Sequence, residues 1–126
     1  MDKLEYIPGD LVKFATNTYT IVNFEENFLH NKICYALIST NSTKTAFVAD
    51  RDILPIYITP DILKKNGWKK LYEKFFDKNV NNIRLTIEFR ENIYVAINRI
   101  FIMEIHYVHQ LQHLLFGLGL NSEMEV

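Results

Sequence analysis

Three histidines, His106, His109 and His113, lie within eight residues near the end of the sequence. If this segment is helical, His109 and His113 stand one turn apart and project together, which lets two imidazoles share a metal ion. The stretch HQLQH lacks the glutamate that acts as general base in zinc proteases, and transition metals usually take three or four ligands. Metal binding through His109 and His113 is therefore only the second alternative to a protein-interaction function, after nucleic-acid binding. We expect no cofactor.

Residues 64–78 interleave lysines with aromatic side chains. Single-stranded nucleic acid is bound by cations that contact phosphate and by flat rings that stack on bases. The candidate nucleic-acid-binding residues are Lys64, Lys65, Trp68, Lys69, Lys70, Tyr72 and Lys74. The competing interpretation is a solvated lysine face over a buried aromatic row, because lysine stems readily cover apolar surface. Arginines are few, which argues against sequence-specific base recognition.

Other catalytic arrangements find little support in the sequence. Cys34 lies four residues after His30, but it belongs to the apolar stretch ICYALI, where no cation stabilises a thiolate. The paired carboxylates come without a pocket signature, and the four glycines form no phosphate-binding loop. We therefore predict that the protein is not an enzyme.

Composition sets the scale of the fold. A chain of 126 residues with 48% hydrophobic content can form one compact domain or two small lobes. The formal net charge of -1 provides no overall field toward nucleic acid or anionic membranes. The single cysteine excludes an internal disulfide. No window resembles a signal peptide or a membrane-spanning helix, so we expect a cytoplasmic protein with no membrane partner.

The first half of the chain reads as strands that would position the aromatic side chains. Short β-branched and aromatic runs at 10–15, 19–26, 32–39 and 43–49 are separated by polar turns. They predict an SH3-like β-meander or partial barrel over residues 1–56, closed near Pro55 after a brief turn at 51–53. We expect Tyr19, Phe24, Phe28 and Tyr35 of this lobe to be available for binding.

The second half, residues 57–126, combines helices and strands. Thr59 as N-cap, Pro60 at the first helical position and Gly67 as terminator predict a short helix at 60–66. Residues 69–80 suit either a helix or strands, and this choice stays open. Alternating residues predict three antiparallel strands at 82–90, 92–99 and 100–105, followed by a helix at 107–116 that covers the sheet. The expected fold class is α+β.

Two segments, YITPDILKKNGWKK and YVHQLQHLLFGLGLNSEMEV, resemble small uncharacterised proteins of phages and prophages of Bacteroidota. Those proteins pair an LTPEWLxKxGF type segment with a C-terminal YVHQLQNLYFALTGKEL type segment, and the likeness covers residues 57–126. The matching positions are Thr59, Pro60, Leu63, Gly67, Trp68, Tyr107, Val108, His109, Gln110, Leu111, Gln112, Leu114 and Phe116. The chain departs at His113, where asparagine is expected, and at Gly117, where alanine is expected. The resemblance implies a phage- or prophage-encoded accessory protein in the cytoplasm of a bacterial host cell.

The first functional hypothesis is a non-catalytic protein-interaction module that binds itself or a host protein. In the last helix, the candidate residues are His109, Gln110 and Gln112, expected on a polar face that is turned outward or toward the loop after Pro60, with hydrogen bonds to neighbouring backbone. If residues 100–105 form an edge strand, they can pair with a second copy and give a homodimer. Nucleic-acid binding through residues 64–78 is the alternative.

Overall fold

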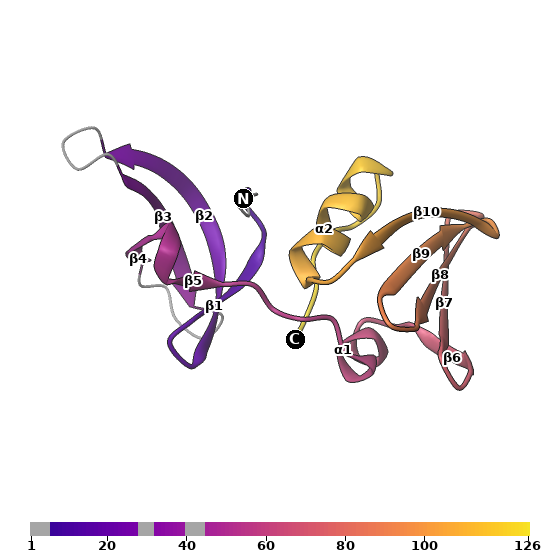
Figure 1. The fold of residues 1–126 in the computed structure, drawn as a ribbon. Helices are drawn as coiled ribbons and strands as arrows, with labels where there is room; N and C mark the ends of the chain where they lie inside the picture. Colours follow the sequence, from indigo (N-terminus) through magenta and orange to yellow (C-terminus); the bar gives the residue numbers. More distant parts are fainter. Residues whose placement is uncertain (1–5, 28–31, 40–44) are drawn as a thin grey trace. The chain divides into compact units, whose positions relative to one another are not determined.

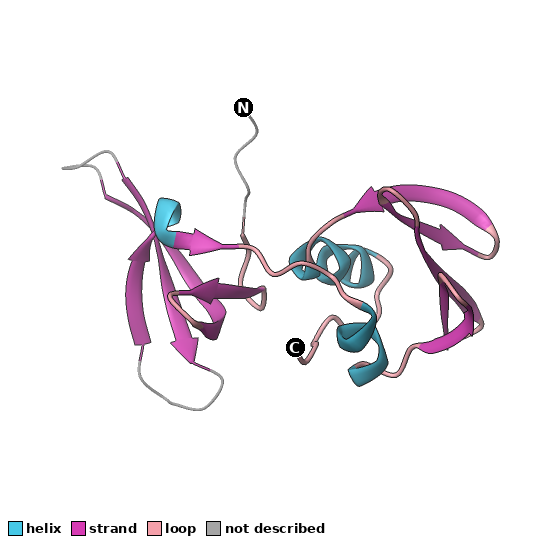
Figure 2. Ribbon diagram, turned by 60° about the horizontal axis from the view of Figure 1, so that its bottom comes forward, coloured by secondary structure: helices cyan, strands magenta, loops and turns pink. Residues whose placement is uncertain are grey.

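The chain divides into two compact units, Met1–Ile56 and Tyr57–Val126. The computed structural model describes residues 6–27, 32–39 and 45–126 (Figure 1). These residues form two antiparallel five-stranded sheets and two α helices, which is an α+β architecture. Figure 2 shows that both α helices belong to the second unit, while the first consists of strands and a single helical turn.

The first unit is a meander whose last strand returns to the first. Its strands are β1 (Leu11–Phe14), β2 (Asn17–Asn27), β3 (Lys32–Ser39), β4 (Thr45–Ala49) and β5 (Ile53–Leu54), with the 3-10 turn η1 (Asp50–Asp52) before β5. The sheet order is β4-β3-β2-β1-β5. Alternate residues of the strands point inward and form a core of Tyr6, Val12, Ile21, Tyr35, Leu37, Val48 and Ile53.

The second unit opens with α1 (Pro60–Lys65), which begins at the predicted residue and ends one residue before the predicted end, with Asn66 as its C-cap. The Thr59 hydroxyl accepts the Ile62 N–H at 3.2 Å, and Gly67 takes a φ of 85° in the turn that ends the helix. Leu63 is the fully buried residue of α1. The short helix is therefore anchored by one apolar side chain and by its caps.

The sheet of the second unit has the order β10-β9-β8-β7-β6. Its strands are β6 (Lys69–Tyr72), β7 (Phe75–Val80), β8 (Ile83–Phe89), β9 (Ile93–Ile97) and β10 (Ile100–Ile105). Residues 69–80, which the sequence left open, form the β6–β7 hairpin. Asn81 and Asn82, like Asn98 and Arg99, have positive φ in two-residue turns, as tight hairpins require.

The helix α2 (Val108–Gly117) follows β10 and lies on the concave side of this sheet in both ribbon views (Figures 1 and 2). The sheet face turned toward the helices is buried. Its buried residues are Phe76, Leu85, Ile87, Val95 and Ile105. The N–H groups of His106 and Tyr107 donate to Gln110 Oε1 at 2.7 and 3.1 Å, which ties the start of α2 to its first turn.

Two positions of α2 contradict the expected polar outward face. His109 and Gln112 are 2% and 3% exposed, whereas Phe116 is 69% exposed. The expectation was wrong because it assumed that one side of α2 faces solvent. Gln112 Nε2 donates to the Ser122 carbonyl oxygen at 3.1 Å, so the residues that follow α2 cover this second side.

Candidate functional site

The three histidines occupy different environments. The His109 ring is buried, stacks on the Tyr107 ring at 5.7 Å between centroids, and meets the His113 ring edge-on at 5.5 Å. Burial, with a smaller contribution from His113, lowers the pKa of His109 to about 4. His109 is therefore neutral at physiological pH and is not exposed for contact with a partner.

A third ligand for a metal at His109 and His113 is missing from the described residues. Within those ranges, no group of three or more histidine, cysteine, aspartate or glutamate side chains is arranged to hold a metal ion. His106, before α2, lies 3.9 Å from the Glu104 carboxylate instead.

Tyr107, the residue before α2, forms an isolated β-bridge with Tyr57. The hydrogen bond between their side chains, together with burial, raises the pKa of Tyr107.

The predicted lysine and aromatic patch is divided by the fold. Trp68 is 3% exposed and packs in the core, so it does not present a ring to a nucleic acid. Tyr72, at the end of β6, is 73% exposed and meets the Phe75 ring edge-on at 6.2 Å. The predicted lysines, Lys64, Lys65, Lys69, Lys70 and Lys74, are all exposed. The structure thus leaves Tyr72 as the stacking residue among them.

Neither of the two aromatic candidates of the first unit whose side chains the structure describes is fully exposed. Tyr35 is 5% exposed and belongs to the core, where its ring meets Tyr6 edge-on at 5.6 Å. Tyr19 is half-buried and packs against the same core. Phe24 lies in β2 and its side chain is outside the described part, as is the whole of Phe28. The expectation that Tyr35 is available for binding is therefore wrong.

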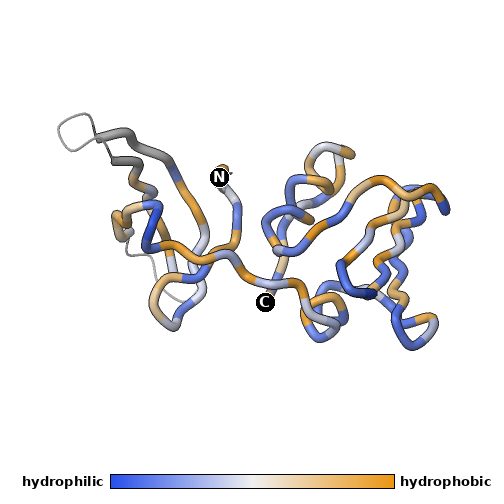
Figure 3. The backbone as a smooth tube through the Cα atoms, in the orientation of Figure 1, coloured by the Kyte–Doolittle hydropathy of each residue, from blue (hydrophilic) through white to orange (hydrophobic). Residues whose placement is uncertain are grey.

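Three of the eleven exposed large hydrophobic side chains of the described residues follow one another on β10, which ends the sheet as an edge strand. Ile100, Phe101 and Ile102 are 66%, 59% and 46% exposed, and Figure 3 shows hydrophobic colours along most of this strand. The Phe101 ring meets the Tyr94 ring of β9 at 5.6 Å. We call Tyr94, Ile100, Phe101 and Ile102 the β10 surface. Consecutive exposure of this kind marks an interaction site more often than isolated exposed leucines do.

The strand register shows which way Phe101 points. Phe101 lies opposite Ala96, Ala96 opposite Thr86, and Thr86 opposite Asp77, so these four residues share one face of the sheet. The alternating positions form the buried face toward the helices. Phe101 and Tyr94 therefore stand on the face that α1 and α2 leave uncovered. Ile100 lies opposite Ile97 and belongs to the other face, so the β10 surface spans both faces at this edge of the sheet.

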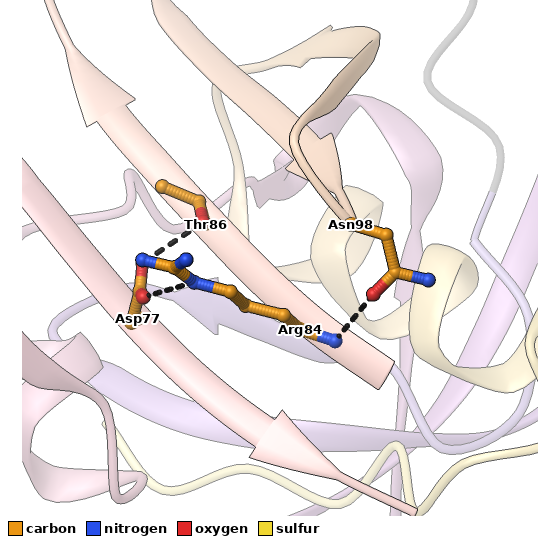
Figure 4. A network of polar contacts seen from close by, with 4 residues as sticks. All are labelled: Asp77, Arg84, Thr86 and Asn98. Carbon is orange, nitrogen blue, oxygen red and sulfur yellow. Dashed lines mark hydrogen bonds and ion pairs between the residues drawn. The ribbon is translucent and has the colours of Figure 1, made fainter. Parts of the chain in front are cut away.

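A polar network lies on this uncovered face (Figure 4). The Asp77 carboxylate, which is buried, accepts hydrogen bonds from Arg84 Nε at 2.6 Å and Thr86 Oγ1 at 2.8 Å. Asn98 Oδ1 accepts the Arg84 backbone N–H at 2.9 Å. Because Asn98 belongs to the turn that begins β10, the network connects the centre of the sheet to the start of the β10 surface. Sequence reasoning missed it, although the alternation of Arg84 with Thr86 on one strand was visible.

An arginine also approaches the β10 surface. Arg90 lies over the Tyr94 ring, 5.7 Å from its centroid, and its Nε donates to Glu88 at 2.7 Å. The ion pair raises the pKa of Arg90. Tyrosine, phenylalanine and arginine together are the residue types enriched at the energetic centres of protein interfaces.

Within the part of the chain that the structure describes, neither α helix is long and apolar enough to cross a membrane. In comparisons with known proteins, no family model, no curated protein and no solved structure matches the chain.

Proposed function

We propose that the protein is a non-catalytic protein-interaction module that contacts its partner through the β10 surface. The observation that carries this proposal is the exposure of Ile100, Phe101 and Ile102 on one edge strand. Covering large apolar side chains contributes about 1.5–3 kcal/mol each when they are fully buried. A partner that covers these residues therefore gains from the hydrophobic effect without any catalytic group.

The two edges of the same sheet differ in a way that supports this assignment. The opposite edge strand, β6, carries Lys69 and Lys70, and charged side chains are a common protection against unwanted pairing. The exposed residues of β10 from Ile100 to Ile102 include no charge. The edge at β6 thus combines its exposed Leu71 and Tyr72 with two lysines, whereas the exposed run of β10 has no charge.

The mode of contact follows from a bulge in β10. The register with β9 shifts between Phe101 and Met103, so the outward backbone groups of β10 are unevenly spaced. A bulge of this kind impairs pairing with a long straight strand. Recognition is therefore proposed to rest on packing against Phe101 and Tyr94 rather than on a continuous added strand. Homodimerisation through the edge stays a prediction.

The biological setting is proposed from the sequence resemblance over residues 57–126. It assigns the protein as a phage- or prophage-encoded accessory factor that acts on a protein of the bacterial host. The first unit is proposed to be an SH3-like partial barrel, because β5 returns to pair with β1 after the helical turn η1.

The test uses Phe101→Glu with Phe116→Glu as its matched control. Both phenylalanines are exposed, but Phe116 lies on α2, apart from the β10 surface. Tagged full-length chains are incubated with nuclease-treated host lysate, the captured protein is purified, and its dissociation constant is measured for all three chains. Phe101→Glu is expected to weaken binding at least tenfold, whereas Phe116→Glu leaves it unchanged. Equal affinity for Phe101→Glu and the unmodified chain would refute the assignment.

We infer nucleic-acid binding at the β6 edge as the second candidate. The observation that favours it is the exposed Tyr72 ring close in sequence to Lys69, Lys70 and Lys74. Stacking on such a ring is worth about 1–3 kcal/mol per base. Tyr72→Ala is then expected to weaken binding of a labelled single-stranded oligonucleotide at least fivefold in fluorescence anisotropy. No binding by the unmodified chain at low salt would exclude this candidate.

A further inference from the structure

Residues 121–126 of the second unit follow α2 and are held by side-chain amides of the same unit. Asn66, at the end of α1, accepts the Glu125 backbone N–H at 2.8 Å through Oδ1 and donates from Nδ2 to the Glu125 carbonyl oxygen at 2.7 Å. Gln112 of α2, itself 3% exposed, donates to the Ser122 carbonyl oxygen at 3.1 Å. The segment is thus held by hydrogen bonds at Ser122 and Glu125, which lie three positions apart in the sequence.

Every one of these contacts reaches the backbone of the segment and not its side chains. The paired bonds from Asn66 reproduce the exchange of N–H and carbonyl bonds that two antiparallel strands make. We call the side-chain amides of Asn66 and Gln112 the clamp. Because the clamp contacts only backbone atoms, it can hold a segment whatever side chains that segment carries. It recognises an extended chain as such, as strand-adding peptide sites do.

The position of Asn66 is held by contacts that do not involve the segment. Asn66 Nδ2 also donates to the Ile62 carbonyl oxygen at 2.7 Å, and the Asn66 carbonyl oxygen accepts Lys78 Nζ at 2.7 Å. The Asn66 amide is therefore set in place by the fold before a segment binds, which lowers the entropic cost of binding.

The held segment is weakly attached compared with the elements around it. None of these six described residues is buried. A hydrogen bond between neutral groups adds little net stability in water, because the same groups bond to water when they separate. Segments with few buried apolar contacts open locally at low free-energy cost. The clamp is therefore accessible to a competing chain.

Charge indicates which chain competes. A hollow of about 400 Å³ beside the clamp is lined by Lys65, Asn66 and Lys78 on one side and by Asn121, Glu123, Met124 and Glu125 of the segment. Lys65 and Lys78 supply positive charge where Glu123 and Glu125 supply negative charge. The hollow thus brings two lysines of the unit and a Glu-x-Glu pattern of the segment to one lining.

We propose that Asn66, Gln112, Lys65 and Lys78 form a binding site for an extended acidic segment of another protein, with a Glu-x-Glu pattern. Residues 121–126 occupy this site as an internal competitor. A tethered segment competes as if it were present at millimolar concentration, so the site is masked until the segment is displaced. The site shares no residue with the β10 surface, and each can fail without the other.

The test releases the internal segment in the full-length chain. Glu125→Pro removes the N–H that Asn66 accepts and leaves the rest of the site intact. The probe is a fluorescein-labelled peptide of sequence NSEMEV, and fluorescence anisotropy reports its binding. We expect Glu125→Pro to bind the peptide at least tenfold more tightly than the unmodified chain. Adding Asn66→Ala to Glu125→Pro is expected to abolish binding, whereas adding Asn79→Ala, a control at an exposed asparagine of β7, leaves it unchanged.

Two modified peptides test the clamp and the charge separately. N-methylation of the fifth residue removes the N–H that Asn66 would accept and is expected to weaken binding at least tenfold, whereas N-methylation of the fourth residue has little effect. The sequence NSKMKV is expected to bind at least tenfold less tightly at low salt.

Three results would overturn the proposal. The first is no peptide binding by Glu125→Pro at millimolar concentration while circular dichroism shows the native fold. The second is binding that survives Asn66→Ala. The third is a dimer of the unmodified chain, seen by light scattering, that Glu125→Pro abolishes, since this would assign the site to the same segment of a second copy.

Discussion

Acidification should destabilise the second unit through His109. The pKa of this buried side chain is about 4, against 6.5 for an unperturbed histidine, because burial disfavours the charged imidazolium and His113 adds repulsion. Above pH 6.5 the folded and unfolded chains both hold a neutral His109. Between pH 6.5 and 4 the unfolded chain binds a proton that the folded chain does not, so the free energy of unfolding falls as the pH falls.

The magnitude follows from the difference between the two pKa values. Each pH unit corresponds to about 1.4 kcal/mol, so the full loss is about 3 kcal/mol and is complete only below pH 4. At pH 4.5 the loss is about 2.5 kcal/mol by the same relation. A domain of this size has roughly 5–15 kcal/mol of stability in total, so the effect is measurable.

Trp68 provides the assay. It is the single tryptophan of the chain and is buried in the second unit, so its fluorescence reports the unfolding of that unit in urea. The free energy of unfolding is measured from pH 7.5 to 4.5 for the unmodified chain and for His109→Gln. The rest of the chain is the same in both proteins, so the difference between the two pH profiles reports His109 together with its interaction with His113.

Parallel pH profiles for the unmodified chain and His109→Gln would refute the reasoning. They would mean that the folded protein accepts a proton at His109 as readily as the unfolded chain does. A steeper loss for His109→Gln would contradict the sign of the effect.

Three further substitutions test the packing that positions the candidate sites. Thr59→Ala removes the N-cap bond of α1 and should cost about 1 kcal/mol in urea unfolding followed by Trp68 fluorescence; no change would show that the cap is dispensable. Asp77→Ala deprives Arg84 of its buried partner and should cost about 1–3 kcal/mol, with a smaller loss for Asp77→Asn, and an equal loss for both would argue against a role for the charge. Leu111→Ala leaves a cavity under α2 and should cost about 2–5 kcal/mol, whereas a loss below 1 kcal/mol would mean that α2 does not pack on the sheet.

Local residue patterns predicted much of the secondary structure. The strands at Lys32–Ser39 and Ile100–Ile105 begin and end where alternation predicts, and α1 follows its capping residues closely. These features depend on interactions between residues near in sequence, such as caps and the period of two along a strand. For residues 69–80, local patterns did not decide between a helix and strands. An aromatic run with lysines suits both a helix and a hairpin until its partner strand is known.

The candidate sites were predicted less well, because exposure is not a local property. Tyr35, His109 and Gln112 were expected at surfaces and are buried, and Trp68, for which a buried position was the competing interpretation, is buried as well. Each belongs to a residue type that is found in both places, and the deciding factor is what packs over it. The burial of Gln112 depends on Ser122, which follows α2 and folds back along it.

The sequence by itself determined the α+β class, the alternation of the strands and the limits of α1, because these follow from side-chain size, branching and backbone preference within a few residues. Only the tertiary structure decided that β10 is an edge, that His109 is neutral and buried, and that Asn66 meets the backbone of Glu125. Those outcomes depend on pairs of segments that lie up to 59 residues apart in the chain. Contact between such segments is set by the packing of the whole unit, and no local pattern encodes it.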